Sequence, residues 1–387
     1  MTYMQSNGTV FMRRIALLLV VAAAAGAGTA CGDPIVVLGE TPGTVRNVAG
    51  IGDSAGNRID TLATKSRFQT LTAVAFNDDD NILYVTDRGA TRNVNGITTP
   101  IARLFSVTSS GRLVKVLDGG GCSTGGFCLV EATNMIIVPG NRLLIADAVE
   151  NRVSQFDIAA RTLSLFAGTG SATNAVDGAA AVTSPVNRPS GVVRASDGNV
   201  YISEQGSGRV LRVGTDGIIR VVAGGGTGTA STAPTAATSI RMGNPAGLAL
   251  GGGILYIADR ELSSVYTMVL ATGMLTRIIG DGVPGFRGDA GPGVAARLQA
   301  PTDVELDASG QTLYIADTGN NRVRSFNITT AIINTYMGSG STIYNGDHVA
   351  AGATSLKLPI HLETSTLGFL FVVDQGHYVV RRSTIVF

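Results

Sequence analysis

Tyr314-Ile315-Ala316-Asp317 is the clearest copy of a four-residue pattern, an apolar run that ends in an acid, which recurs six times along this 387-residue chain. The copies are Tyr84–Asp87, Leu144–Asp147, Tyr201–Glu204, Tyr256–Asp259, Tyr314–Asp317 and Phe371–Asp374. Their acids lie 60, 57, 55, 58 and 57 residues apart. A period of this length, built on short apolar strands, predicts a radial repeat architecture.

The fifth repeat predicts four strands joined by turns. The strand-like runs cover 301–307, 313–317, 322–326 and 332–336. Turn residues such as Ala308-Ser309-Gly310 separate them. The second run is apolar on both faces, as expected of a strand that lies between neighbouring sheets. Four antiparallel strands per unit form a propeller blade, so we predict an all-β, six-bladed β-propeller over residues 45–387.

This blade resembles the NHL repeat, which builds six-bladed propellers in many bacterial surface proteins. The similarity lies in the linker 285–292, the run Tyr-Ile-Ala-Asp-Thr-Gly-Asn-Asn-Arg at 314–322 and the closing Gly338-Ser339-Gly340. It extends over residues 45–387, with an insertion at 88–100 in the first repeat. The resemblance also implies metal-dependent lyases and lactonases as possible activities.

The last repeat lacks a fourth strand, and the missing strand is found near the beginning of the chain. Residues 45–52 match the fourth-strand ends at 165–170 and 221–226. We therefore predict that this N-terminal strand completes the last blade and closes the ring. Such closure leaves no unpaired sheet end that could aggregate.

The first thirty residues have the order of a secretory signal. Arg13-Arg14 precede the apolar run 15–25, and small residues lead to Cys31. The apolar run is too short for a membrane span. Gly28-Thr29-Ala30-Cys31 resembles a bacterial lipobox, which implies lipidation of Cys31; cleavage by an ordinary signal peptidase is the alternative.

These features predict a signal peptide over 1–30, a lipidated Cys31 with a tether over 31–44, and a propeller over 45–387. The predicted location is the bacterial cell envelope, with the protein anchored by lipid at the outer membrane or the cell surface. Cys122 and Cys128 enclose five residues and are predicted to form a disulfide in that oxidising environment. A net charge of +1, without a basic run, gives no electrostatic footprint for nucleic acid.

The acid that ends each second strand is repeated in every blade, so we predict a structural role. It would accept hydrogen bonds from turn amides and pair with an arginine five residues further on. The starts of the first strands lie nearest the axis, at Ala73, Asn134, Gly191, Gly247, Asp303 and His361.

The polar members of this set, Asn134, Asp303 and His361, are candidates for ligand binding at the channel mouth. Asp303 and His361 fall in adjacent blades, and such a pair can orient a general base or hold a metal. The alternative is a hydrogen-bonded structural pair. No catalytic set, metal site or cofactor is predicted from the remaining residues, because the three histidines all fall in the last blade and zinc needs three or four converging ligands.

Long linkers at 171–188, 227–244, 283–300 and 341–358 are predicted to cover one face of the propeller. Loops on a rigid scaffold commonly carry recognition. The predicted function is therefore a lipid-anchored binding scaffold for a protein, peptide or glycan. A lyase or hydrolase that uses Asp303 and His361, and a structural component of an envelope assembly, are the alternatives.

Overall fold

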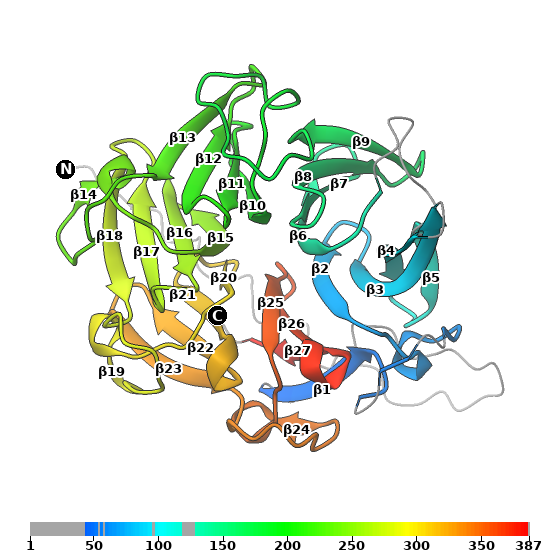
Figure 1. Ribbon diagram of the computed structural model, residues 1–387. Coiled ribbons are helices and arrows are strands. Elements are labelled where there is room, and N and C mark those ends of the chain that lie inside the picture. Colours follow the sequence, from blue (N-terminus) through cyan, green and yellow to red (C-terminus); the bar gives the residue numbers. More distant parts are fainter. Residues whose placement is uncertain (1–42, 53–54, 57–58, 95–96, 118–127, 386–387) are drawn as a thin grey trace, which may run out of the picture. The chain divides into compact units, whose positions relative to one another are not determined.

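The computed structural model describes residues 43–52, 55–56, 59–94, 97–117 and 128–385, which lie within one compact unit. They form six antiparallel sheets arranged around an axis, so the predicted all-β, six-bladed propeller is confirmed (Figure 1). The predicted signal peptide, Cys31 and Cys122 lie outside the described residues. The lipid anchor and the disulfide between Cys122 and Cys128 therefore stay predictions.

In each blade the strands pair in the order of the chain, except in the last, where a strand from the N-terminal end is added. Blade 1 comprises β2 (Leu71–Asn77), β3 (Ile82–Val94), β4 (Ile97–Val107) and β5 (Leu113–Leu117). Blade 2 comprises β6 (Ala132–Val138), β7 (Arg142–Asp147), β8 (Arg152–Asp157) and β9 (Thr162–Ala167). Blade 3 comprises β10 (Pro189–Arg194), β11 (Val200–Glu204), β12 (Arg209–Val213) and β13 (Ile219–Gly224). Blade 4 comprises β15 (Pro245–Gly251), β16 (Ile254–Asp259), β17 (Ser264–Val269) and β18 (Met274–Ile279). Blade 5 comprises β20 (Asp303–Leu306), β21 (Thr312–Asp317), β22 (Arg322–Asn327) and β23 (Ile332–Met337). Blade 6 comprises β25 (Pro359–Thr364), β26 (Phe369–Asp374) and β27 (Val379–Thr384), with β1 (Thr44–Ala49) as its fourth strand.

The linkers add short pieces of secondary structure. The two-residue strands β14 (Thr235–Ala236), β19 (Gly291–Pro292) and β24 (Val349–Ala350) pair with β18, β23 and β1. The 3-10 helices are η1 (Ala63–Lys65), η2 (Ala237–Ser239), η3 (Gly293–Ala295), η4 (Thr318–Asn320), η5 (Ala351–Ala353) and η6 (Gln375–His377). Among the described residues, no helix has the length and hydropathy that crossing a membrane requires.

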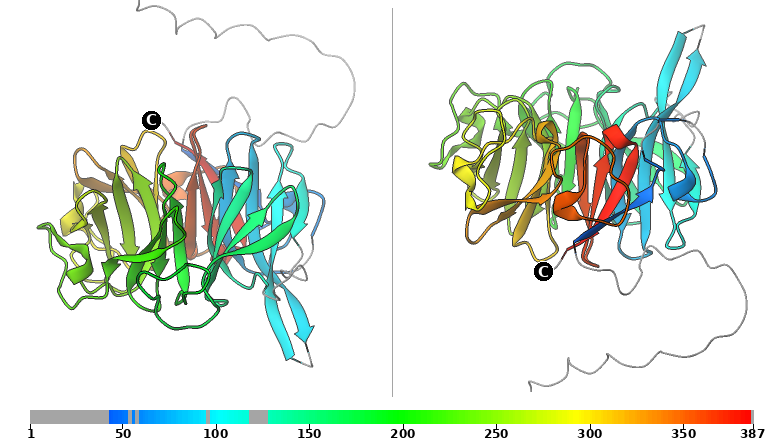
Figure 2. Two further views of the ribbon diagram at one scale, coloured as in Figure 1. Left: turned by 90° about the horizontal axis from the view of Figure 1, so that it is seen from above. Right: turned by 90° about the horizontal axis from the view of Figure 1, so that it is seen from below.

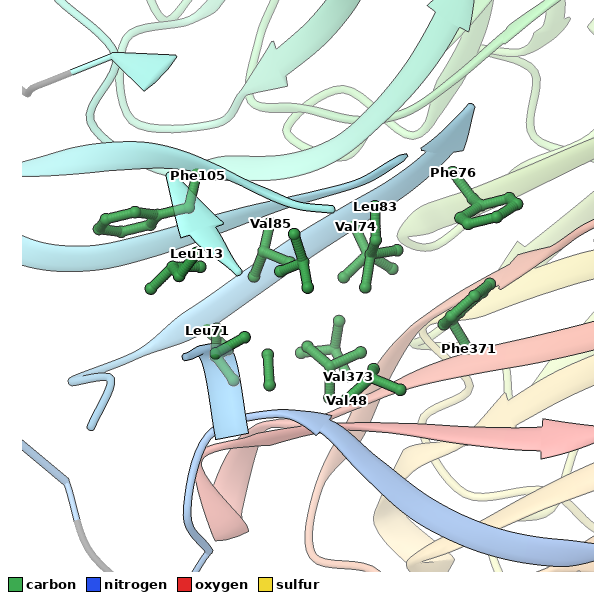
Figure 3. Close-up of a cluster of buried hydrophobic side chains, with 14 of the residues drawn as sticks. Val48, Leu71, Val74, Phe76, Leu83, Val85, Phe105, Leu113, Phe371 and Val373 are labelled. Atoms are coloured by element: carbon green, nitrogen blue, oxygen red, sulfur yellow. The ribbon is translucent and has the colours of Figure 1, made fainter. Parts of the chain in front are cut away.

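The ring closes as the sequence predicts. Strand β1 pairs antiparallel with β27, with Asn47 opposite Arg381. Val48 of β1 lies in one buried apolar cluster with Phe371 of β26 and with residues of blade 1 (Figure 3). In that cluster the rings of Phe76 and Phe371 stack with their centroids 5.0 Å apart. The first and last blades are therefore joined by packing as well as by the shared chain.

A glycine after the fourth strand recurs for a steric reason. Gly50 follows β1 with a φ of +87°, and a Cβ atom there would lie 2.2 Å from the carbonyl oxygen of Tyr378. The equivalent clash would occur at four further closing glycines, namely Gly168, Gly224, Gly280 and Gly338, with 2.4, 2.0, 2.4 and 2.6 Å between the added Cβ and a carbonyl oxygen. Gly50 therefore occupies in blade 6 the position that these four glycines occupy in blades 2 to 5.

The insertion in the first repeat lengthens one hairpin. Strands β3 and β4 continue their pairing beyond the Asp87–Arg103 pair to Val94 and Ile97. Figure 2 shows this hairpin as a two-stranded ribbon that projects from the body of the propeller. The insertion therefore adds an extension without interrupting the blade.

Replacing Gly50 by Ala should destabilise the protein by about 2–4 kcal/mol, since the new methyl group adds a backbone clash to the cost of the left-handed conformation. Gly111→Ala is the matched control, because Gly111 also has a positive φ (+74°) but no atom within 4 Å of the added Cβ. Urea unfolding of both variants measures the difference. Equal losses of about 1 kcal/mol in the two variants would contradict the close approach at the ring closure.

Candidate functional site

The acids that end the second strands stabilise the turns around them, as predicted from their repetition. The Asp147 carboxylate accepts hydrogen bonds from the backbone N–H groups of Val130, Glu131, Val149 and Glu150 at 2.6–3.1 Å. Burial raises the pKa of Asp147, and these amide hydrogen bonds oppose the rise. This acid serves the fold and is not free to contact a ligand.

The predicted arginine partner is wrong in blade 5. Asp317 pairs with Arg324, seven residues further on, at 3.4 Å between Oδ2 and Nη1. Arg322, five residues on, instead donates to the carbonyl oxygens of Asn320 and Ser339. Blade 6 has the same arrangement as blade 5, with Arg381 Nε at 3.1 Å from Asp374 Oδ2.

In blade 1 the insertion places Arg103 sixteen residues after Asp87, and the predicted pairing of acid and arginine across the β3–β4 hairpin does occur. The third strands differ at one position: the buried Arg324 and Arg381 of blades 5 and 6 correspond in the strand register to Phe105 in blade 1.

Asn134, Asp303 and His361, the three polar residues predicted at the channel, lie together. Asn134 Nδ2 is 2.7 Å from His361 Nε2, and His361 Nε2 is 3.8 Å from Asp303 Oδ2. Each of these residues is less than 10% exposed, at 7%, 3% and 2% for Asn134, Asp303 and His361. Three different blades thus contribute to one buried polar cluster.

Burial decides the charge of this cluster. It raises the pKa of Asp303 to about 8 and lowers the pKa of His361 to about 3. Both side chains are consequently uncharged at neutral pH, and the imidazole is a much weaker base than an efficient general base requires. The geometry favours the hydrogen-bonded alternative over the catalytic pair.

Two glycines make room for the cluster. A Cβ atom on Gly247 would lie 2.0 Å from Asp303 Oδ1, and one on Gly191 would lie 2.5 Å from the carbonyl oxygen of Ala246. The first strands of blades 3, 4 and 5 therefore approach closely at this level of the channel.

Polar side chains also satisfy backbone groups on the inner edges of the blades. Asp303 Oδ2 accepts from the N–H of Leu362 at 2.8 Å, and Asn134 Oδ1 accepts from the N–H of Val192 at 3.3 Å. Each of these hydrogen bonds joins one blade to the next. The donors belong to first strands, whose inner edge has no neighbouring strand to pair with.

Glu305 and Glu363 belong to the same channel and were not identified from the sequence. Each lies two residues after Asp303 or His361 on the same strand. Glu363 Oε1 accepts from the N–H of Phe76 at 3.0 Å, and Glu305 Oε1 accepts from Thr364 Oγ1 at 3.3 Å. The two-residue alternation of side chains along a strand was the signal that could have revealed them.

A cavity of about 560 Å³ opens beyond these carboxyl groups. Its walls are formed by the ends of the first strands and by the turns that follow them, including Gly251, Gly252, Ser309 and Gly310. The interblade linkers enter the first strands at their opposite ends. The cavity and the linkers therefore lie on opposite faces of the propeller.

These features define a six-bladed β-propeller with a polar channel and a cavity at one end. In sequence the chain is similar to Protein SUPPRESSOR OF QUENCHING 1, chloroplastic, from Arabidopsis thaliana (29% identity over 253 residues, covering 62% of this chain and 24% of the relative). It is also similar to human NHL repeat-containing protein 2 (28% identity over 239 residues, covering 54% of this chain and 32% of the relative). The predicted resemblance to NHL-repeat proteins is confirmed by such homologues and by the fold. The chain spans about a quarter to a third of the length of these curated relatives, and no family model matches it.

Solved structures share the fold at low sequence identity. A protein of unknown function and an auxiliary nutrient binding protein, both from Bacteroides thetaiotaomicron, have TM-scores of 0.62 and 0.60 at 14% and 13% identity, each covering 88% of this chain and 75% of the other. A gluconolactonase from Xanthomonas campestris has a TM-score of 0.54 at 12% identity, covering 88% of this chain and 89% of the other. At these identities the similarity establishes the architecture and not the activity.

Asp303→Asn should flatten the dependence of stability on pH. The folded-state pKa of Asp303, about 8, lies above its ordinary value of 3.8. The stabilisation by the protonated form is therefore complete below about pH 4 and lost as the pH rises to about 8. Relative to the variant, the wild type should lose about 1–3 kcal/mol of unfolding free energy over this range.

Urea unfolding at several pH values measures that loss, and Asp216→Asn, at an exposed turn, is the control expected to follow the wild type. Parallel curves for the wild type and Asp303→Asn would show that Asp303 is ionised at neutral pH in the folded protein.

Proposed function

We propose that this protein is an exported binding propeller that takes a small organic group in the cavity at the end of its channel. The observation that carries this proposal is a cavity of about 560 Å³ with apolar side chains on one side of its wall and two partly buried carboxyl groups on the other. Ligand sites in proteins commonly combine apolar side chains with a few placed polar groups that fix the orientation of the ligand. A free small molecule, or a group presented by a peptide, glycan or protein, would suit such a site.

The cavity wall divides into an apolar and a polar part. Phe76, Ile136, Val193 and Leu250 supply apolar surface from four blades. Glu305 and Glu363 supply carboxyl groups from the other side, and Arg194 supplies an exposed guanidinium. The apolar part would bind the body of the ligand, while the polar part would orient it.

The linkers on the opposite face are held to the blades, which favours a structural role for them. The Glu204 carboxylate accepts from the N–H of Ala175 at 3.1 Å and of Asn187 at 2.7 Å, at the two ends of one linker. Arg324 Nη2 similarly lies 2.7 Å from Asp289 Oδ1 in another linker. Recognition through the linkers is therefore the less favoured version of the binding function.

Export and lipid attachment at Cys31 are part of the proposal. They are supported by the order of charged, apolar and small residues at the start of the chain and by the beginning of the first blade strand at Thr44. Auxiliary nutrient binding proteins among the propellers of similar fold are compatible with extracytoplasmic ligand binding.

Val193→Trp should fill the cavity and abolish binding of whichever compound a thermal-shift panel of sugars, amino acids, amines and nucleosides identifies. Val176→Trp, at a linker residue that is 55% exposed, is the control and should bind normally. Isothermal titration gives the two affinities, and a retained cooperative unfolding transition shows that each variant is folded. Loss of binding in Val176→Trp alone would place the site on the linker face and overturn the cavity proposal.

Cys31→Ser should release the protein from membranes, because stable attachment requires the acyl chains, each buried methylene of which contributes about 0.8 kcal/mol. Membrane sedimentation and labelling with a radioactive fatty acid provide the measurement. Gly32→Ala should remain labelled and sedimented. If Cys31→Ser sedimented like the unaltered protein, the lipid anchor would be wrong while the cavity could still bind ligand.

A further inference from the structure

We propose that the ligand of the cavity carries a protonated amine, and that the carboxyl groups of Glu305 and Glu363 bind this ammonium group. The inference rests on the proposed function and specifies the chemical class of its ligand. It is carried by the geometry of the two carboxyl groups, the charges around them and the size of the cavity.

The two carboxyl groups come from adjacent blades and line the same cavity. Glu305 lies on β20 and Glu363 on β25, and both contribute to the cavity wall. Each uses its Oε1 atom for a contact with the neighbouring blade, namely with Thr364 Oγ1 and with the N–H of Phe76. Among the described residues, none donates a hydrogen bond to Oε2 of either group. One oxygen on each side is therefore left for a ligand that donates hydrogen bonds.

The surroundings of this pair are acidic. Asp303 on β20 and Asp78, which follows β2, are close enough to Glu363 to raise its pKa in addition to the effect of burial. His361 on β25 is uncharged, since burial lowers its pKa to about 3. No ion pair joins Glu305 or Glu363 to a basic group in the described part of the chain, and Arg194 is the basic residue in the cavity wall.

Without a counter-charge, the pair retains protons. Burial, with smaller effects from Asp303 and Asp78, raises the pKa of Glu363 to about 8. Burial and the charges of Glu363 and Asp303 raise the pKa of Glu305 well above its ordinary value. An ammonium group placed between them would supply the missing positive charge and displace those protons. A neutral ligand of the same shape would gain nothing from ionisation of the pair.

The cavity favours an organic amine over a metal ion. A volume of about 560 Å³ far exceeds the space a single ion occupies, and Phe76, Ile136 and Leu250 offer apolar surface for a carbon skeleton. Within the described residues, no three or more His, Cys, Asp or Glu side chains are arranged to hold a metal ion. The two carboxyl groups would bind the ammonium group of such a ligand, and the apolar wall would contact its hydrocarbon part.

Hexylamine and hexan-1-ol test this inference, because they have nearly the same shape and differ in charge. Isothermal titration of the full chain at about pH 8.5 should show binding of the amine at least about tenfold tighter than binding of the alcohol. At about pH 6 the preference should shrink, since the pair is then protonated. Titration in two buffers of different ionisation enthalpy should show that the amine, but not the alcohol, releases protons from the protein.

Glu363→Gln and Glu305→Gln should each remove the preference for hexylamine while leaving the affinity for hexan-1-ol within about twofold. Glu261→Gln is the matched control, because Glu261 is an exposed acid paired with Arg241 away from the cavity. Arg194→Gln should leave the amine affinity unchanged or increase it. A cooperative unfolding transition confirms that each variant is folded.

The outcomes separate this inference from the proposed function. Equal affinities of the two hexyl compounds, both abolished by Val193→Trp, would overturn the ammonium site and retain the cavity as a ligand site. Binding of calcium chloride that depends on Glu363, without binding of hexylamine, would overturn the organic amine in favour of a metal. If neither compound bound and no member of the wider panel bound, the proposed function would fail as well.

Discussion

The structure depends on finding hydrogen-bond partners for the backbone groups of the six first strands, whose inner edges have no further strand to pair with. Each first strand exposes backbone N–H and C=O groups towards the axis, and leaving such groups buried without partners is costly. Side chains from the neighbouring blade accept the N–H groups of Leu362, Val192 and Phe76. Hydroxyl groups donate to the backbone carbonyl oxygens in the same way. Thr302 Oγ1, for example, donates to the carbonyl oxygen of Ile360 at 2.9 Å. Hydrogen bonds between adjacent blades therefore line the channel.

These hydrogen bonds between blades explain why carboxyl groups lie close together at one side of the axis. Asp303, Glu305 and Glu363 each bridge from one of the last two blades to the next. Asp303 and Glu363 accept from backbone N–H groups and Glu305 from a hydroxyl group, and burial raises the pKa of all three carboxyl groups. A requirement of the fold therefore creates a polar lining that a ligand can use, and stability and recognition depend on some of the same side chains.

The sequence predicted the architecture well, because the features that fix it are local and repeated. Short apolar runs, turn residues and closing glycines recur in every repeat, and residues 45–52 could be assigned to the last blade by their similarity to the other fourth strands. The arginine partner of Asp317 could not be predicted in the same way. Arg322 does lie opposite Asp317 in the strand register, but the carboxylate turns into the blade interior where Arg324 is buried. The direction of a side chain at a turn depends on packing that spacing alone does not specify.

The candidate site was predicted in part. Asn134, Asp303 and His361 were selected by position and do come together, but the burial that changes the pKa values of Asp303 and His361 depends on the packing of the closed ring, including the close approach of Gly247 to Asp303. Glu305 and Glu363 follow on the same strands, and only the closed ring shows that they share a cavity with Phe76 and Arg194.

The way the ring closes has a consequence for how the molecule is presented to its surroundings. The N–H of Gly43 lies 3.3 Å from the carbonyl oxygen of Thr384, and the N–H of Ile385 donates to the carbonyl oxygen of Gly368 at 2.9 Å, in the turn after β25. The chain thus enters and leaves the propeller on the face where the cavity opens. A molecule attached to a support directly at Gly43 or Ile385 would hold its cavity towards that support, with the linker face and the β3–β4 ribbon turned outwards.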